Sequence, residues 1–197
     1  MLKQILQILF PAPEHGNLTV CLESAQLKIR YPYCGVFEYD DNAKKIVAAV
    51  KYHKNRELIP FIQQEFLKHA PAKKADLLIP VPLNPLRYQE RGFNQAEEFV
   101  RTYAALHGIA LRSDIVYRGR NTTKLAALSP DARQKETADI FQVWENKQKE
   151  LAGKRIIIAD DIITTGSTVK NLADVLAKYA PESIEILGVF RPTTIRL

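Results

Sequence analysis

The chain has 197 residues, which is enough for one domain with a sizeable core and too few for two full domains. Hydrophobic residues make up 46% and charged residues 25%, proportions that exclude a disordered or low-complexity chain. With 28 Lys and Arg against 22 Asp and Glu, the formal net charge of +6 favours phosphate-bearing partners, either a nucleotide-sized ligand or a nucleic acid. A solvated basic surface without any partner would give the same excess.

The N-terminal ten residues place apolar side chains on one face of a predicted helix that Pro11 ends. This helix is too short to span a membrane and lacks the cleavage site of a signal peptide, so we expect a cytoplasmic protein without a membrane span. Cys21 and Cys34 are the only cysteines, and their spacing suits neither a disulfide framework nor a redox pair. Both thiols are therefore expected to be reduced.

Helical periodicity recurs in three further segments of the first half of the chain, at 43–51, 58–69 and 96–104. A short buried strand is predicted at 76–81, where a series of prolines stops it. We expect a rigid loop at 82–94 to follow this strand and to bring basic residues to the start of the next helix.

A short strand is predicted at Ile115–Tyr117, and a polar stretch of about twenty residues follows it up to Ile140. Loops of that length inside a compact domain are usually lids, binding loops or disordered segments. Two interpretations stay open here, a basic lid over a bound anion and a solvated surface loop.

The most informative segment runs from Ile156 to Val169, where two adjacent carboxylates and a hydroxyl-rich turn separate a strand from a helix. The isoleucines at its start predict a strand buried on both faces, as in a parallel sheet. Apolar spacing then predicts a helix over 169–180, and a further strand is predicted at 183–190. This order predicts a right-handed parallel crossover with the acidic pair at the carboxyl edge of the sheet, where open α/β sheets bind ligands.

The chemistry of this segment suits a sugar phosphate. Unpaired N–H groups at a helix start, a close approach at Gly166 and the hydroxyls of the turn can all contact a phosphate. Asp160 and Asp161 can accept hydrogen bonds from vicinal ribose hydroxyls and can tolerate a shared Mg²⁺. A simpler interpretation is that Asp160 caps the turn and the hydroxyls cap the helix.

The whole run from Ile156 to Val169 closely resembles the phosphoribosyl-pyrophosphate (PRPP) signature of type I phosphoribosyltransferases. Within that superfamily, the segment from Ile79 to Ala96, with Pro-Val-Pro-Leu and Arg-Gly-Phe-Asn-Gln, is similar to the ComF family, which is linked to DNA uptake in naturally competent bacteria. The resemblance extends from about residue 36 to the C-terminus. It implies a degenerate N-terminal segment at 1–35 and a phosphoribosyltransferase-like domain at 36–197.

The resemblance implies an α/β fold, with a parallel sheet flanked by helices and a small hood. It also implies that Asp160 and Asp161 hold the ribose of PRPP. The residues implied for the 5′-phosphate are Thr164, Thr165, Gly166, Ser167 and Thr168. Those implied for the pyrophosphate loop are Pro82, Leu83, Arg87, Arg91, Gly92 and Asn94. Those implied for a flexible loop over the site are Lys124, Arg133 and Lys135. Mg²⁺ is implied as a cofactor held mainly through PRPP.

The chain departs from the family pattern in two places. ComF proteins commonly begin with a zinc ribbon, whereas His15, Cys21 and Cys34 fall short of a closed four-ligand site, so we expect no structural zinc. In the flexible loop, Leu125 stands where the family usually has Gln, and Glu136 and Asp139 stand where it tends to have Asn and Gly. These differences put loop closure, and therefore catalysis, in question.

Two functions follow as alternatives. An enzyme would transfer phosphoribose from PRPP to a nitrogen nucleophile with loss of pyrophosphate. A binding protein, which we favour, would keep the site for PRPP or another sugar phosphate and act through single-stranded DNA and DNA-uptake proteins. Aromatic and basic residues that could bind single strands by stacking and charge are Tyr31, Tyr33, Lys51, Tyr52, Arg87 and Tyr88. The acceptor base and the oligomeric state stay open.

Overall fold

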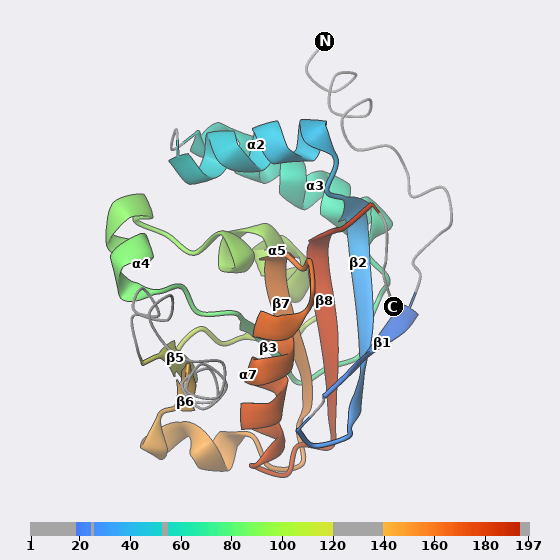
Figure 1. Ribbon diagram of the computed structural model, residues 1–197, viewed down its shortest axis with the longest axis vertical. Coiled ribbons are helices and arrows are strands. Elements are labelled where there is room, and N and C mark those ends of the chain that lie inside the picture. The colour runs from blue at the N-terminus through green and yellow to red at the C-terminus, as the bar shows by residue number, and fades with distance from the viewer. Residues whose placement is uncertain (1–18, 25, 53–54, 120–139, 194–197) are drawn as a thin grey trace, which may run out of the picture.

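A mostly parallel sheet forms the centre of the computed structural model, which describes residues 19–24, 26–52, 55–119 and 140–193 (Figure 1). The six strands lie in the order β1-β2-β8-β7-β3-β4, and only β1 runs antiparallel to its neighbour. Their bounds are β1 Thr19–Glu23, β2 Arg30–Glu38, β3 Leu77–Pro80, β4 Ala110–Leu111, β7 Arg155–Ile162 and β8 Ser183–Arg191. A second, two-stranded antiparallel sheet consists of β5 (Val116–Arg118) and β6 (Phe141–Val143).

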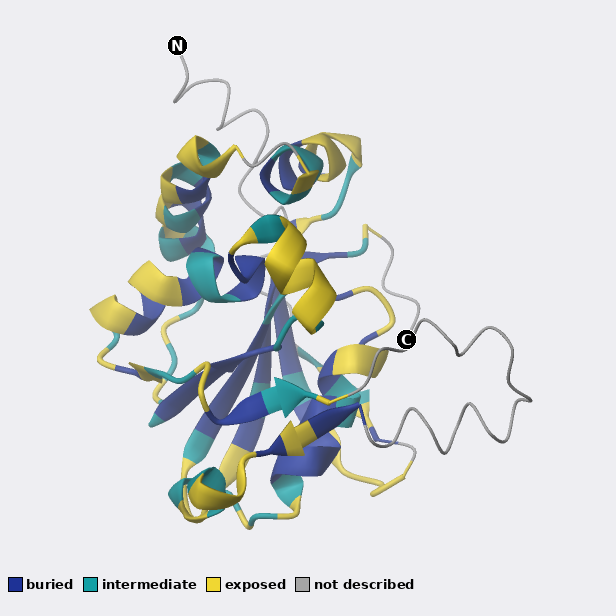
Figure 2. Ribbon diagram, turned by 90° about the vertical axis from the view of Figure 1, so that its left-hand side faces the viewer, coloured by how far each residue is buried: buried dark blue, intermediate teal, exposed yellow. Residues whose placement is uncertain are grey.

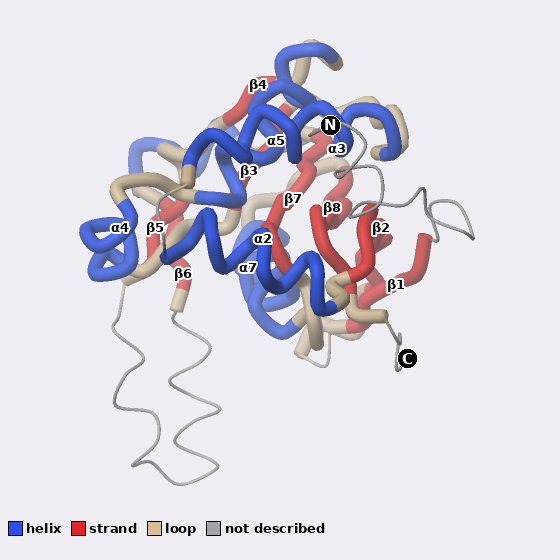
Figure 3. Tube along the Cα trace, turned by 90° about the horizontal axis from the view of Figure 1, so that it is seen from above, coloured by secondary structure: helices blue, strands red, loops and turns tan. Residues whose placement is uncertain are grey.

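Helices cover both faces of the six-stranded sheet (Figure 3). The α-helices are α2 Asp41–Tyr52, α3 Ile59–His69, α4 Pro85–Arg91, α5 Gln95–Leu106 and α7 Ser167–Ala177, and the 3₁₀ helices are η1 Arg56–Leu58 and η3 Glu145–Glu150. One apolar cluster joins the sheet to α2, α3 and α5, and the other joins its opposite face to α7 and the small sheet. Figure 2 shows the sheet buried between these layers, with exposed residues on the outer sides of the helices.

The central strands follow from their sequence. Ile156, Ile157 and Ile158 are each at most 1% exposed, because β7 lies between β3 and β8 and is covered on both faces. Ile156 and Ile158 face α7, whereas Ile157 faces the cluster of α2, α3 and α5. The predicted α/β class, with a parallel sheet flanked by helices, is thus confirmed, and the predicted hood stays a prediction.

The predicted helices at 43–51, 58–69, 96–104 and 169–180 correspond to α2, α3, α5 and α7. The predicted strands at 76–81, 115–117, 156–158 and 183–190 correspond to β3, β5, β7 and β8. The N-terminal ten residues, predicted as a helix, lie outside the described residues.

The N-terminal strands were not predicted. β1 and β2 extend the main sheet through the pairing of β2 with β8, and the predicted domain boundary after residue 35 lies inside β2. Residues 19–24 and 26–35 therefore belong structurally with the sheet. A separate N-terminal segment stays a prediction only for residues outside the described ranges.

The prediction of a loop throughout 82–94 was wrong, because α4 occupies its centre. Asn84 caps this helix by accepting a hydrogen bond from the Leu86 N–H at 2.9 Å, and Pro85 takes the first helical position. Gly92 ends the helix in the left-handed conformation, with φ of 79°. Local capping chemistry thus turns a proline-containing connection into two turns of helix. Within the described ranges, no helix combines the length and the apolar character needed to cross a bilayer.

Candidate functional site

The hydroxyl-rich turn connects β7 to α7 at the carboxyl edge of the sheet. Gly166 stands at the N-cap of α7 with φ of 71°, and no side chain caps the helix there. Thr164, Thr165, Ser167 and Thr168 are exposed, and the Thr165 and Ser167 hydroxyls lie 2.8 Å apart. Residues 162–169 and Asp160 line a hollow of about 30 Å³, which is more than one water molecule occupies. The Ser167 N–H already donates a long hydrogen bond of 3.4 Å to Thr165 Oγ1, and the remaining first-turn N–H groups and the exposed hydroxyls are available to an anion.

The acidic pair lies directly before this turn. The Asp161 N–H donates to Asp160 Oδ1 at 2.9 Å, so the two residues are locked together locally. Burial, and then the adjacent negative charge of Asp161, raise the pKa of Asp160 well above its ordinary value, while Lys51 partly opposes this rise. A ligand hydroxyl that donates a hydrogen bond, or a bound cation, would therefore stabilise the ionised form of Asp160.

Lys51, in the last turn of α2, pairs with the second acid. Its Nζ lies 2.5 Å from Asp161 Oδ2, and the two side chains are only 15% and 14% exposed. Figure 1 shows α2 lying across the end of the sheet from which β2 leads into that helix. Sequence reasoning placed Lys51 among the basic and aromatic residues and not at the acidic pair. A signal was nevertheless present in the sequence, because the tripeptide Val50-Lys51-Tyr52, at the end of the predicted helix, is also similar to the ComF pattern.

Four buried side-chain atoms among the described residues have no hydrogen-bond partner. They are the Tyr33 hydroxyl, Gln95 Nε2, Arg118 Nε and Asp161 Oδ2, the last of which meets Lys51 as an ion pair without hydrogen-bond alignment. Such atoms are rare in folded proteins and call for a specific explanation.

Apart from Asp161 Oδ2 itself, two of these atoms belong to residues on which the charge of Asp160 acts. Burial raises the pKa of Tyr33, and the charge of Asp160 adds to that rise. Burial lowers the pKa of Arg118, and the charge of Asp160 opposes this. Gln95 follows Asn94, whose Nδ2 donates to the carbonyl of Val81 at the end of β3. Unsatisfied polar groups of β2, β5 and β7 thus lie within electrostatic range of one another, as expected for a site that binds a polar ligand.

The predicted pyrophosphate loop starts close to the acids. The Val81 N–H donates to the Ala159 carbonyl at 2.8 Å, and Pro82 and Leu83 then lead into α4. Asn94 has a structural role, because it is buried and its Oδ1 accepts from the Ala96 N–H at 3.1 Å, which caps α5.

The two arginines predicted for this loop differ in their surroundings. Arg87 is exposed and pairs with Glu90 at 3.0 Å. Arg91 donates to Gln95 Oε1 at 2.8 Å, and its guanidinium carbon lies 5.5 Å from the centre of the Tyr52 ring. The structure therefore holds Arg91 between α4 and the end of α2 that also carries Lys51. Lys124, Arg133 and Lys135, predicted for the flexible loop, lie outside the described residues.

The proposed set of stacking tyrosines divides into two groups. Tyr31 and Tyr33 are 3% and 4% exposed, so they cannot stack on bases at the surface, and the Tyr31 hydroxyl donates to the buried Asp174 at 2.9 Å. Tyr52 and Tyr88 are 65% and 53% exposed. Local sequence pattern could not separate the two pairs, because burial of β2 depends on partners from distant parts of the chain.

Comparison with known proteins identifies the domain type. A family model described as "Phosphoribosyl transferase domain" matches residues 112–193, which include β7, the turn and α7. A structure of the allosteric regulatory enzyme of purine biosynthesis gives a TM-score of 0.46 at 17% identity, over 66% of this chain and 25% of the other.

Three curated relatives are also similar. Competence protein F from Haemophilus influenzae is 32% identical over 119 residues, covering 60% of this chain and 52% of the relative. DNA utilization protein YhgH from Salmonella typhi is 30% identical over 111 residues, with coverages of 56% and 47%. Competence protein ComFC from Bacillus subtilis is 26% identical over 140 residues, with coverages of 68% and 53%. The chain thus spans about half the length of these relatives.

The mostly parallel sheet and the matched domain define a protein of the phosphoribosyltransferase type. The motif similarity noted in the sequence and the three curated relatives both indicate a narrower group within this type. The chain is thus similar to proteins of the ComF family.

Proposed function

We propose that this protein binds PRPP, or a closely related sugar phosphate, at the carboxyl edge of its sheet and serves DNA uptake through that site. The observation that carries the proposal is the meeting of an uncapped, hydroxyl-rich turn with an acidic pair around which buried polar atoms lack partners. A ligand with both a phosphate and vicinal hydroxyls would satisfy both halves.

In this proposal the turn from Thr164 to Thr168 holds the 5′-phosphate, and Asp160 and Asp161 hold the ribose hydroxyls. The segment from Pro82 to Asn94, with Arg91 in the last turn of α4, would contact the other end of the ligand. Two adjacent carboxylates supply few of the six oxygens that Mg²⁺ requires, and one of them already pairs with Lys51. Mg²⁺ would therefore enter with the ligand's phosphates and neutralise their charge.

The DNA part of the proposal rests on the similarity to competence and DNA utilization proteins and on one exposed surface. Tyr88 and Arg91 lie one turn apart on α4, and Arg91 covers the ring of Tyr52. The two tyrosines are exposed, so this row of aromatic, basic and aromatic side chains could stack on bases of a single strand and attract its backbone. We name Tyr52, Tyr88 and Arg91 the aromatic row.

Ligand binding tests the site. With Mg²⁺ and PRPP at a hundred times the dissociation constant, the stabilisation is about 2.7 kcal/mol, which raises the melting temperature by about 5–11 °C for a chain of this size. Asp160→Asn with Asp161→Asn should weaken PRPP binding strongly and leave inorganic phosphate binding nearly intact. The exposed pair Asp41→Asn with Glu182→Gln serves as a charge-matched control. If millimolar PRPP gives no shift with the wild-type protein, the site assignment is wrong.

DNA binding and catalysis are tested side by side. Affinity for single-stranded DNA should fall by about 0.7 log units per phosphate contact for each log unit of salt, and Tyr52→Ala with Tyr88→Ala should weaken it about 25-fold or more. Leu106→Ala, at a residue 70% exposed on α5, is the control. If the protein instead releases pyrophosphate from PRPP with some nucleobase and binds no single strand at low salt, it is a phosphoribosyltransferase enzyme.

A further inference from the structure

The hairpin of β1 and β2 packs one of its faces against α7, the helix that begins at the hydroxyl-rich turn. Side chains alternate between the two faces of a strand, and β1 follows this rule. Val20 and Leu22 pack in the apolar cluster that contains α7, and Ser24, directly after β1, is 2% exposed. Cys21 and Glu23, which lie between them, are exposed. Three alternate residues of the first strand and its end thus face the helix of the candidate phosphate site.

The first of two contacts joins Leu22 to the start of α7. A Cβ added at Gly166 would lie 2.8 Å from Leu22 Cδ1, and the three atoms nearest to that position all belong to Leu22. The methyl groups of Leu22 therefore lie against the backbone of the N-cap. Because no side chain caps this helix, its start lacks the local hydrogen bond that usually fixes it. Packing against Leu22 can fix the backbone there instead.

The second contact lies about two turns further along α7, where Ser24, Tyr31 and Asp174 form what we name the carboxylate anchor. Asp174 is 8% exposed although its neighbours on the helix are apolar. The Ser24 hydroxyl donates to Asp174 Oδ2 at 2.8 Å, and the Tyr31 hydroxyl donates to Oδ1 at 2.9 Å. Ser24 is itself oriented by the Leu27 N–H, which donates to its Oγ at 3.0 Å. Burial, and then the hydrogen bond to Asp174, raise the pKa of Tyr31, so its hydroxyl keeps the proton that it donates.

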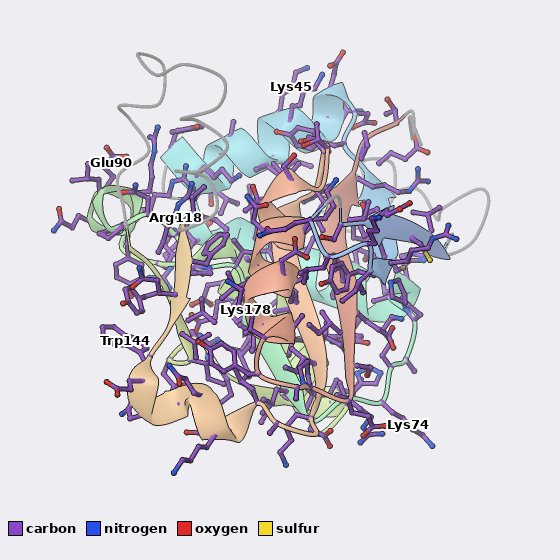
Figure 4. All side chains as sticks on the ribbon, turned by 60° about the horizontal axis from the view of Figure 1, so that its bottom comes forward. Lys45, Lys74, Glu90, Arg118, Trp144 and Lys178 are labelled. Atoms are coloured by element: carbon purple, nitrogen blue, oxygen red, sulfur yellow. The ribbon has the colours of Figure 1, made fainter. Side chains whose placement is uncertain are left out.

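The two contacts fix α7 both at its start and along its axis. A buried carboxylate is stable only when its oxygens accept hydrogen bonds, so the anchor ties the helix to one position on the hairpin. Figure 4 labels Lys178, at the C-cap of α7, and shows the helix over the sheet, beside β1. Asp174 and Gly166 are only about 12 Å apart along the helix, and an α-helix is stiff over that length. A shift at the anchor therefore moves the N–H groups of the first turn.

We propose that the hairpin of β1 and β2 positions the candidate phosphate turn, with Leu22 setting the backbone at Gly166 and the carboxylate anchor fixing α7 along its axis. This role rests on the proposed function, because it assumes that the turn at 164–168 binds the 5′-phosphate. Both strands lie outside residues 112–193, which the family model matches, and neither was predicted from the sequence. The N-terminal strands therefore contribute to ligand binding without contacting the ligand.

Calorimetric titration of the full chain with ribose 5-phosphate tests the role of Leu22. Leu22→Ala should weaken binding about fivefold or more, because a displaced N-cap misdirects an N–H that donates to the charged phosphate. Leu22→Met, which keeps the volume of the side chain, should bind within about twofold of wild type. Val20→Ala is the matched control, because Val20 is half-buried in the same cluster but is not among the atoms nearest to Gly166. It should lower the melting temperature, as Leu22→Ala does, and leave the affinity within about twofold of wild type.

Removing one hydroxyl tests the carboxylate anchor. Tyr31→Phe takes away one of the two hydrogen bonds to Asp174 and should weaken ribose 5-phosphate binding about threefold or more. Tyr103→Phe is the control, because the buried Tyr103 also donates one hydrogen bond, to the Pro71 carbonyl at 2.7 Å, but packs on the opposite face of the sheet. Tyr103→Phe should lose similar stability and no affinity.

Ligand affinity distinguishes positioning of the turn from simple support of the fold. If Leu22→Ala and Val20→Ala lose affinity equally, or if neither Leu22→Ala nor Tyr31→Phe loses any, the hairpin only supports the fold and the positioning role is wrong. Leu22→Val, which removes a single methylene, provides the same comparison should Leu22→Ala fail to fold. If the wild-type protein does not bind ribose 5-phosphate, the proposed function fails first, and the positioning role fails with it.

Discussion

Removing the ammonium group of Lys51 should destabilise the protein, because it leaves the carboxylate of Asp161 unpaired in a poorly solvated place. The two charges lie 2.5 Å apart, and their side chains are 15% and 14% exposed. At an effective dielectric constant of about 20, the direct attraction at that distance is about 7 kcal/mol. Most of it is offset by the desolvation of both groups, so the pair itself contributes far less.

The measurable quantity is the free energy of unfolding that is lost when one partner of the pair is removed. Breaking a fully buried pair costs about 3–5 kcal/mol, and the remaining exposure of this pair reduces the expected value for Lys51→Met to about 2–3 kcal/mol. For a chain of this size, that corresponds to a melting temperature lower by about 4–12 °C. Asp161→Asn should cost less, because the long side chain of Lys51 can turn towards water.

A double-mutant cycle on unfolding by urea measures the pair directly. Lys51→Met with Asp161→Asn should be no less stable than Lys51→Met alone, giving a coupling energy above about 1.5 kcal/mol. The exposed pair Lys44–Asp41 on the same helix, with a distance of 2.8 Å, is the matched control, and its coupling should stay below about 0.5 kcal/mol. Additive effects at Lys51 and Asp161, within about 0.5 kcal/mol, would refute the reasoning.

Three further predictions concern the stability of the protein without ligand. The pKa of Asp160 is raised above its ordinary value of 3.8, so the native state loses stability as pH rises through that shifted pKa. Asp160→Asn should therefore melt higher than wild type at pH 7 and equally at pH 4. Tyr33→Phe should raise stability by up to about 1 kcal/mol, because the buried hydroxyl lacks a partner. Gly166→Ala should cost about 2–3 kcal/mol and Gly92→Ala about 1–2 kcal/mol. Both glycines have positive φ, but only at Gly166 would a Cβ meet a neighbour, Leu22 at 2.8 Å.

Thermal and urea unfolding without ligand check all three. A difference between Asp160→Asn and wild type that is the same at pH 4 and pH 7 would contradict the raised pKa. A loss of stability in Tyr33→Phe would mean that the hydroxyl has a partner, such as an ordered water. Equal costs at Gly166 and Gly92 would show that Leu22 moves aside freely.

The acidic pair and the phosphate turn could be predicted because their chemistry is contiguous in the chain. A strand, two acids, a turn and a helix start follow one another within fourteen residues, so local pattern and local structure agree. Lys51, Tyr33 and Arg118 could not be assigned in this way. Lys51 reaches Asp161, and the charge of Asp160 acts on Tyr33 and Arg118, only through the packing of distant segments, so local chemistry alone did not assign them to the site.

β2 shows why a strand can escape prediction. Pro32 and Gly35 both argue against a strand by local propensity. In the structure, a Cβ at position 35 would collide with the Tyr33 hydroxyl, so glycine allows the ring of Tyr33 to lie close against its own strand. Gly35 therefore weakens the local strand pattern, but the buried side chain of Tyr33 needs a glycine at that position.

The C-terminal turn of α2 couples the two proposed ligand sites. Lys51 and Tyr52 are consecutive, and one pairs with Asp161 while the other lies under the guanidinium of Arg91. A ligand that draws Lys51 away from Asp161 acts on the same helical turn that supports the aromatic row. Thermodynamic linkage then requires reciprocity: whatever factor a sugar phosphate imposes on the affinity for DNA, DNA must impose on the affinity for the sugar phosphate.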